Sequence, residues 1–166
     1  MIALRLAKIG MAASLALFAF MVTFNNITDY DSNFTFVRHV LSMDTTFPNN
    51  ALRWRAITDP VLWHVGYWII IMGEALTCAA YAIGTAALLG KLRASGDAFN
   101  RGKRFVFIGT ALGFLVWFLG FMVVGGEWFA MWQSQTWNGQ EAAFRFYAAL
   151  LGTGLFIALE DRDVTT

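Results

Sequence analysis

The sequence predicts an all-α polytopic membrane protein with four transmembrane helices in a single domain. Of its 166 residues, 58% are hydrophobic and only 14% are charged, whereas about 25% of residues are charged in a typical soluble domain. The chain also contains four apolar runs of about 20 residues, the length that crosses a bilayer as a helix. We expect these spans at about residues 5–26, 61–89, 105–124 and 142–159.

The first apolar run begins like a signal peptide, because Arg5 and Lys8 precede it. No small-x-small cleavage motif closes it; the run ends in Val22, Thr23 and Phe24. We therefore expect an uncleaved first span.

The loop at residues 28–59 is polar and contains a helical pattern. Phe34, Val37 and Leu41 lie at helical spacing, and residues 31–33 (Asp, Ser, Asn) are good N-cap types. We expect a short interfacial helix here, lying along the membrane surface.

Basic residues set the expected orientation. They occur before the first span and in the loop at residues 91–104, and such segments face the cytoplasm. Both termini are therefore expected in the cytoplasm, with the loops at 28–59 and 126–141 outside. The basic residues of the cytoplasmic loop are Lys91, Arg93, Arg101, Lys103 and Arg104.

The second span carries one acidic residue, Glu74, near its middle. A charged side chain at the centre of a transmembrane helix costs roughly 2.5–3.5 kcal/mol, so such residues are usually neutralised, paired or turned toward protein. Tyr67 and Tyr81 lie seven residues to either side and share its helix face. Two interpretations remain open: an interhelical hydrogen bond, with Arg145 as one candidate partner, and a proton relay or ligand contact.

A contact surface for another protein is expected on the third span and the loop after it. Gly109 and Gly113 form a small-residue ridge of the kind that lets membrane helices approach closely. Trp128 and Trp132 follow at a spacing of four. Six of the seven tryptophans belong to the outer side, which suggests either a compact cap or a surface for a partner: Trp54, Trp63, Trp68, Trp128, Trp132 and Trp137.

No residue pattern indicates an enzyme, a metal site or a cofactor site. His39 and His64 are the only histidines, and Cys78 is the only cysteine. The sequence Asp29-x-Asp31-x-Asn33 begins like a calcium loop but has Phe34 where the loop needs glycine. No basic stripe suggests nucleic-acid binding.

Three segments carry a resemblance to a known family: residues 25–34, residues 37–47, and Arg53-Trp54-Arg55. With these segments and four spans over its full length, the chain resembles a family of predicted small integral membrane proteins of Gram-negative bacteria, a domain of unknown function. The resemblance implies a bacterial inner membrane and brings no catalytic or binding residues with it.

These patterns favour a non-catalytic accessory or stabilising subunit of a larger inner-membrane complex, respiratory or otherwise redox. Its partners would be membrane lipid and other integral membrane subunits. The alternative is a small transporter, or a membrane protein that handles quinone or protons, centred on Glu74.

The orientation predicts the outcome of reporter fusions. Fusions at Thr45, Asp97 and Gln135 should report the outside, the cytoplasm and the outside, respectively, with paired periplasmic and cytoplasmic reporters. A cytoplasmic signal at Thr45 would reverse the topology.

Overall fold

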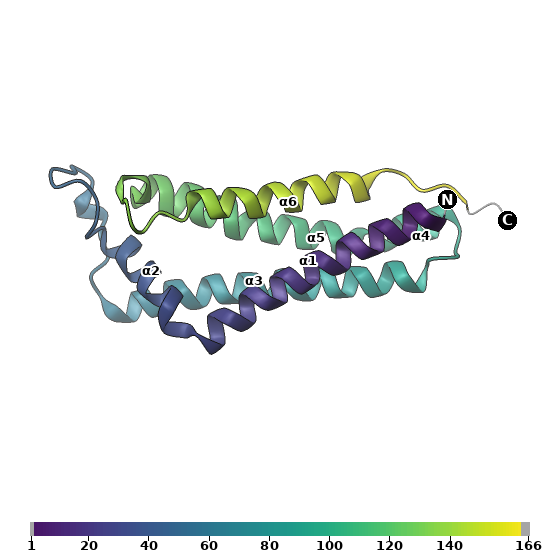
Figure 1. Cartoon of the computed structure of the whole chain (residues 1–166), viewed down its shortest axis with the longest axis horizontal. Coiled ribbons are helices and arrows are strands. Elements are labelled where there is room, and N and C mark those ends of the chain that lie inside the picture. Colours follow the sequence, from purple (N-terminus) through teal and green to yellow (C-terminus); the bar gives the residue numbers. More distant parts are fainter. Residues whose placement is uncertain (1, 164–166) are drawn as a thin grey trace.

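The computed structural model describes residues 2–163 as a bundle of four long helices (Figure 1). They are α1 (Ile2–Thr28), α3 (Pro60–Gly90), the helical run Gly96–Trp128 and α6 (Gln140–Ala158). Each is long and apolar enough to cross a membrane, and no strand occurs in the described part of the chain. The predicted all-α fold with four membrane-spanning helices is confirmed.

The third long helix is a composite. It consists of α4 (Gly96–Gly102), α5 (Arg104–Phe114) and the π-helical stretch η2 (Leu115–Trp128). Helical structure thus begins inside the segment expected as a loop and continues past residue 124. π-Helices are rare and mostly single-turn bulges, often at functional sites, so a 14-residue stretch is unusual.

A further helix, α2 (Tyr30–Ser42), occupies the first long loop, where a short helix is predicted. It begins one residue after α1, with Asp29 at the N-cap position rather than residues 31–33. The Ser32 hydroxyl donates to the Asp29 carboxylate at 2.8 Å. Its position along a membrane surface stays a prediction.

The loops also contain two short 3₁₀ turns, η1 (Arg53–Arg55) and η3 (Met131–Gln133). The Thr45 hydroxyl donates to the Ser134 hydroxyl at 2.9 Å, and the Phe47 amide to the Gln133 side chain at 3.1 Å. The loops after α2 and η2 therefore pack together as a cap.

Helix α3 is the central helix of the bundle. Its start is fixed by Pro60 at the first turn and by the Asp59 carboxylate, which accepts from the Val61 amide at 2.8 Å. It contacts α1, α2 and α5. At 1.5 Å per residue, 31 residues make a helix of about 46 Å, longer than the ~30 Å hydrocarbon core of a bilayer.

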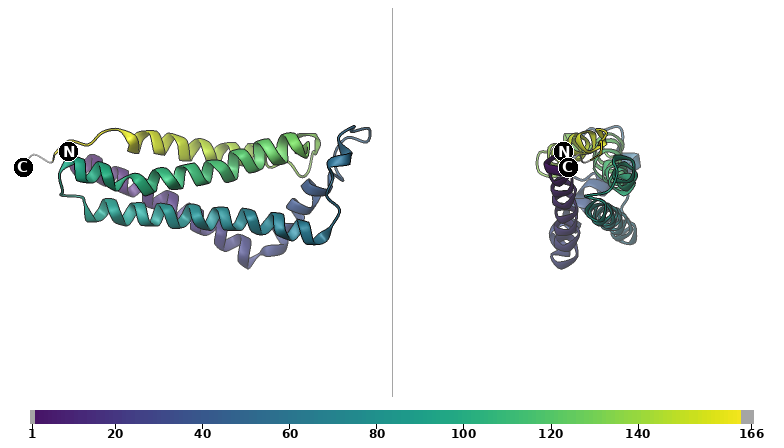
Figure 2. Two further views of the ribbon diagram at one scale, coloured as in Figure 1. Left: turned by 180° about the vertical axis from the view of Figure 1, so that it is seen from behind. Right: turned by 90° about the vertical axis from the view of Figure 1, so that its right-hand side faces the viewer.

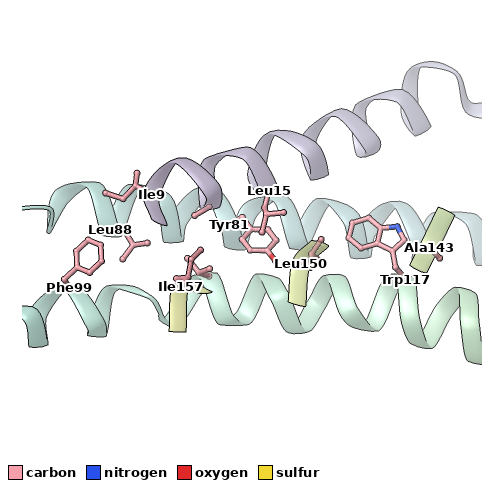
Figure 3. Close-up of a cluster of buried hydrophobic side chains, with 11 residues drawn as sticks. Ile9, Leu15, Tyr81, Leu88, Phe99, Trp117, Ala143, Leu150 and Ile157 are labelled. Atoms are coloured by element: carbon pink, nitrogen blue, oxygen red, sulfur yellow. The ribbon is translucent and has the colours of Figure 1, made fainter. Parts of the chain in front are cut away.

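The start of α1 and the segment after α6 lie at one end of the bundle, which we call the terminal end. Helix α2 and the capping loops lie at the other end, the loop end (Figures 1 and 2). Helix α1 crosses α3 obliquely. The main core contains side chains from every long helix, and Figure 3 shows Tyr81, Trp117 and Leu150 within it. It comprises Ile9, Ala12, Leu15, Tyr81, Leu88, Phe99, Val106, Trp117, Ala143, Leu150 and Ile157.

A buried ionic cluster closes the terminal end. The ammonium groups of Lys8 in α1 and Lys103 before α5 lie 2.5 and 2.6 Å from the same carboxylate oxygen of Asp161. Both lysines also donate to the Leu159 carbonyl. All three charged side chains are at most 2% exposed, so three segments far apart in sequence are joined without solvent.

Arg5 extends this cluster. Its guanidinium is fully buried and donates to the carbonyls of Leu92, Ala94 and Arg162. It also lies 4.6 Å from the ring centroid of Phe99. The orientation was predicted partly from Arg5 and Lys8, as basic residues before the first span. In the structure both side chains are buried and hold segments of the protein together.

Replacing Asp161 should destabilise the protein strongly, because Asp161→Asn leaves two buried lysines without a counter-charge. Breaking a buried ion pair by removing one partner costs about 3–5 kcal/mol. Thermal unfolding in mild detergent measures the loss, and Glu160→Gln, which changes an exposed neighbour, is the matched control. Equal melting of the two variants would contradict the role of the cluster.

The same carboxylate predicts a pH dependence. Burial by itself raises the pKa of Asp161, but hydrogen bonds and charge from Lys103 and Lys8 outweigh burial and lower it. Its stabilisation is therefore complete above the unfolded-state pKa of about 3.9 and is lost as the pH falls through the lower folded-state pKa. As the pH falls below ~4, the melting temperature of the wild type should decrease more steeply than that of Asp161→Asn.

Candidate functional site

Glu74 lies on the face of α3 that packs against α1. Its side chain is buried, with 2% of the residue exposed. One carboxyl oxygen accepts a hydrogen bond from the Asn26 side-chain amide at 2.7 Å. Asn26, near the end of α1, is itself 6% exposed. The partner of Glu74 is therefore an asparagine of the first span.

Asn26 connects Glu74 to two further groups. Its side-chain oxygen accepts from the Asn33 amide of α2 at 2.6 Å, and its backbone carbonyl accepts from the Tyr67 hydroxyl at 3.2 Å. Asn33 is exposed at the molecular surface. The result is a short hydrogen-bonded chain that joins α1, α2 and α3 at the loop end.

The three residues predicted as one buried polar site divide into two groups. Glu74, Tyr67 and Tyr81 are all at most 2% exposed. Glu74 and Tyr67 meet at Asn26, but the Tyr81 hydroxyl pairs with the Thr110 hydroxyl of α5 at 3.1 Å. Tyr81 therefore belongs to the α3–α5 contact and not to the Glu74 network.

Arg145 is not the partner of Glu74. Its guanidinium forms an ion pair with Glu141 on the outside of α6, where both side chains are at least 70% exposed. The pairing of Arg145 with Glu74 considered from the sequence is therefore wrong. Arg145 instead pairs with the residue one helical turn before it, at the i,i+4 spacing that suits an ion pair within one helix.

Glu74 is at the middle of α3 and close to the end of α1. Its partner Asn26 lies two residues before the end of α1, beside the polar Asp29. Since α3 is about 46 Å long, the centre of this helix and the centre of a bilayer need not coincide. The hydrogen bond to Asn26 places the Glu74 carboxyl group beside the last turns of α1.

Both histidines are used in local contacts at the loop end. His64 stacks on Phe34 with ring centroids 4.1 Å apart, and its Nδ1 lies 2.8 Å from the Tyr30 hydroxyl. Burial, and then the charge of Asp31, raises the pKa of Tyr30, so this hydroxyl stays neutral. Residues 2–163 contain no group of three or more His, Cys, Asp or Glu side chains placed to hold a metal.

The predicted partner surface is corrected in part. Gly109 and Gly113 face the inside of the bundle: a Cβ on Gly109 would meet the Tyr81 ring at 3.0 Å, and one on Gly113 would collide with Leu150. This ridge therefore packs against α3 and α6 of the same chain. Trp128 and Trp132, in contrast, are 48% and 49% exposed.

Asn26 and Asp161 are the residues that sequence reasoning missed. A polar side chain near the end of an apolar run looks like a headgroup contact, and an aspartate in a short polar tail looks solvated. For Asn26, the signal in the sequence was Glu74, because a carboxyl group within a membrane span needs a hydrogen-bond donor from another helix.

The comparison with protein families gives one match. A model described as "Predicted small integral membrane protein (DUF2165)" matches residues 4–160. The chain belongs to this family. The comparisons with curated proteins and with solved structures gave no match.

The family description agrees with the four membrane-spanning helices and assigns no activity to any residue. What the Glu74 site can do must therefore be derived from its contacts. A carboxyl group with one amide donor and no cationic partner can hold helices together, and it can also hold a proton.

Substitutions of Glu74 separate these two roles. Glu74→Gln retains an oxygen that accepts from Asn26 and should melt near wild type, whereas Glu74→Ala leaves the buried amide unsatisfied and should lose roughly 1–3 kcal/mol. In a double-mutant cycle with Asn26→Ala, the losses should be non-additive. If Glu74→Gln folds normally but abolishes a proton flux in vesicles, the carboxyl group acts as a relay.

Proposed function

We propose that the protein is a non-catalytic accessory or stabilising subunit of a larger membrane complex in the bacterial inner membrane, with both termini in the cytoplasm. The observation that carries the proposal is an exposed aromatic surface at the loop end. We call it the aromatic rim; its residues are Phe47 (51% exposed), Trp54 (73%), Trp128 (48%) and Trp132 (49%).

The aromatic rim is held in place by contacts within the chain. The Arg55 guanidinium packs against two indoles, 5.3 Å from the Trp54 ring and 4.4 Å from the Trp128 ring. Phe47 packs edge-on against Trp132, with centroids 5.8 Å apart. Tryptophans are the side chains most often responsible for binding energy at protein interfaces, and a preorganised set loses little entropy on binding.

The start of α3 adds apolar area. Val61, Val65 and Ile69 lie at helical spacing and are 66%, 47% and 67% exposed. Helix α3 is longer than the hydrocarbon core by about 16 Å. Unless the helix tilts, part of its exposed apolar face therefore extends beyond the lipid tails and would be exposed to water without another protein. A neighbouring membrane subunit supplies such cover.

The alternative centred on Glu74 has less support. Glu74 does not line the apolar cavity of about 440 Å³ between α3, η2 and α2, and its carboxyl group accepts a hydrogen bond from Asn26. The contacts favour a helix-to-helix hydrogen bond over transport of protons or quinone. Respiratory or other redox complexes remain the class of partner we propose.

Site-specific photo-crosslinking in native membranes tests the subunit role. A photoreactive amino acid at Trp132 or Trp54 should give an adduct of one discrete larger mass, identified by mass spectrometry. The same group at Leu17 of α1 or Leu155 of α6, both exposed, serves as the control for lipid-facing positions. If Trp132 and Leu17 both give only lipid adducts and the protein runs as a monomer in mild detergent, the proposal fails.

A further inference from the structure

The structure contains an apolar cavity of about 440 Å³ at the loop end. Its walls are the first half of α3, the π-helical stretch η2, and α2, with Phe129 and Met131 from the following loop. Every residue that lines it is glycine, aliphatic, aromatic or methionine. The cavity is within the 300–1,000 Å³ range of ligand-binding pockets.

Several of the residues that line the cavity are glycines. A Cβ on Gly73 would lie 2.5 Å from Val116, so α3 and η2 touch at the deep end of the cavity. At Gly120 the nearest atom to an added Cβ is the Leu115 carbonyl oxygen, 3.8 Å away. Gly120 therefore leaves open space where most residues would place a side chain, in the middle of an unusual π-helical wall.

The cavity opens toward the surface between α3 and η2. The lining residues Ile69, Leu115 and Leu119 are 67%, 52% and 45% exposed, and they belong to helices that can cross a membrane. Water does not fill an apolar cavity, whereas hydrocarbon guests do. In a bilayer, the acyl chains of lipids are the molecules next to this opening.

A cation lies close to one end of the cavity. Arg55 donates to the carbonyl of Trp128 at 3.2 Å, and Trp128 precedes the lining residue Phe129. None of the ion pairs among the described residues involves Arg55. An arginine without a carboxylate partner is complementary to a phosphate group.

We propose that this cavity binds one acyl chain of a membrane phospholipid, whose phosphate contacts Arg55. The site does not depend on the subunit role, because its ligand is a component of the bilayer. Glu74 itself does not line the cavity.

Native mass spectrometry of protein purified in mild detergent tests the site. The wild type should keep one phospholipid adduct under activation that strips other lipids, and delipidated protein should regain it from dioleoyl phosphatidylglycerol. Gly120→Leu places a side chain in the cavity and should lose the adduct. Gly152→Leu is the matched control, because an added Cβ there meets nothing within 4 Å and Gly152 does not line the cavity.

Two further variants keep the test decisive. If Gly120→Leu does not fold, Leu119→Trp narrows the opening from the rim and should also lose the adduct. Arg55→Gln should weaken retention while Arg55→Lys preserves it; equal retention in both would overturn the phosphate contact. An isoprenoid quinone mass in place of the phospholipid, no adduct in the wild type, or equal adducts in Gly120→Leu and Gly152→Leu would overturn the proposal.

Discussion

The buried cluster of Lys8, Lys103 and Asp161 is the constraint on which the arrangement of the bundle depends. Two ammonium groups share one carboxylate oxygen and one backbone carbonyl with almost no solvent exposure. Removing Asp161 would leave two buried ammonium groups without a counter-charge, and that penalty amounts to several kcal/mol. The cluster therefore fixes α1, the start of α5 and the segment after α6 relative to one another at the terminal end.

The ion pairs described at the opposite end, His39–Asp44 and Arg145–Glu141, are at least partly exposed rather than buried. Glu74, Asn26 and Asn33 join α1, α2 and α3 by hydrogen bonds, and the capping loops pack through residues such as Met43 and Met131. Since a typical intramolecular hydrogen bond contributes only about 0.5–1.5 kcal/mol, this end is stabilised mainly by packing. The ionic cluster at the terminal end fixes the helices relative to one another, whereas the loop end contains the exposed aromatic side chains and the cavity.

The four spans could be predicted because hydropathy alone decides them: any apolar run of about 20 residues in lipid must satisfy its backbone internally as a helix. Partners could not be predicted in the same way. Arg5 and Lys8 look like interfacial charges in the sequence, and only the folded chain shows that Asp161, more than 150 residues later, meets Lys8. Long-range pairing depends on how α1 crosses α3, which no local pattern encodes.

Glycine positions illustrate the same limit. Gly109, Gly113 and Gly120 form one ridge in the sequence, and a ridge of small residues indicates close helix packing without saying against what. In the structure the first two lie against Tyr81 and Leu150. Gly120 faces open space instead, because the helix changes from α to π after Phe114 and the change in turn rotates later residues away from the α-helical register. The one ridge therefore has two different roles: its first part closes the core of the bundle, and its last part leaves the space that the apolar cavity occupies.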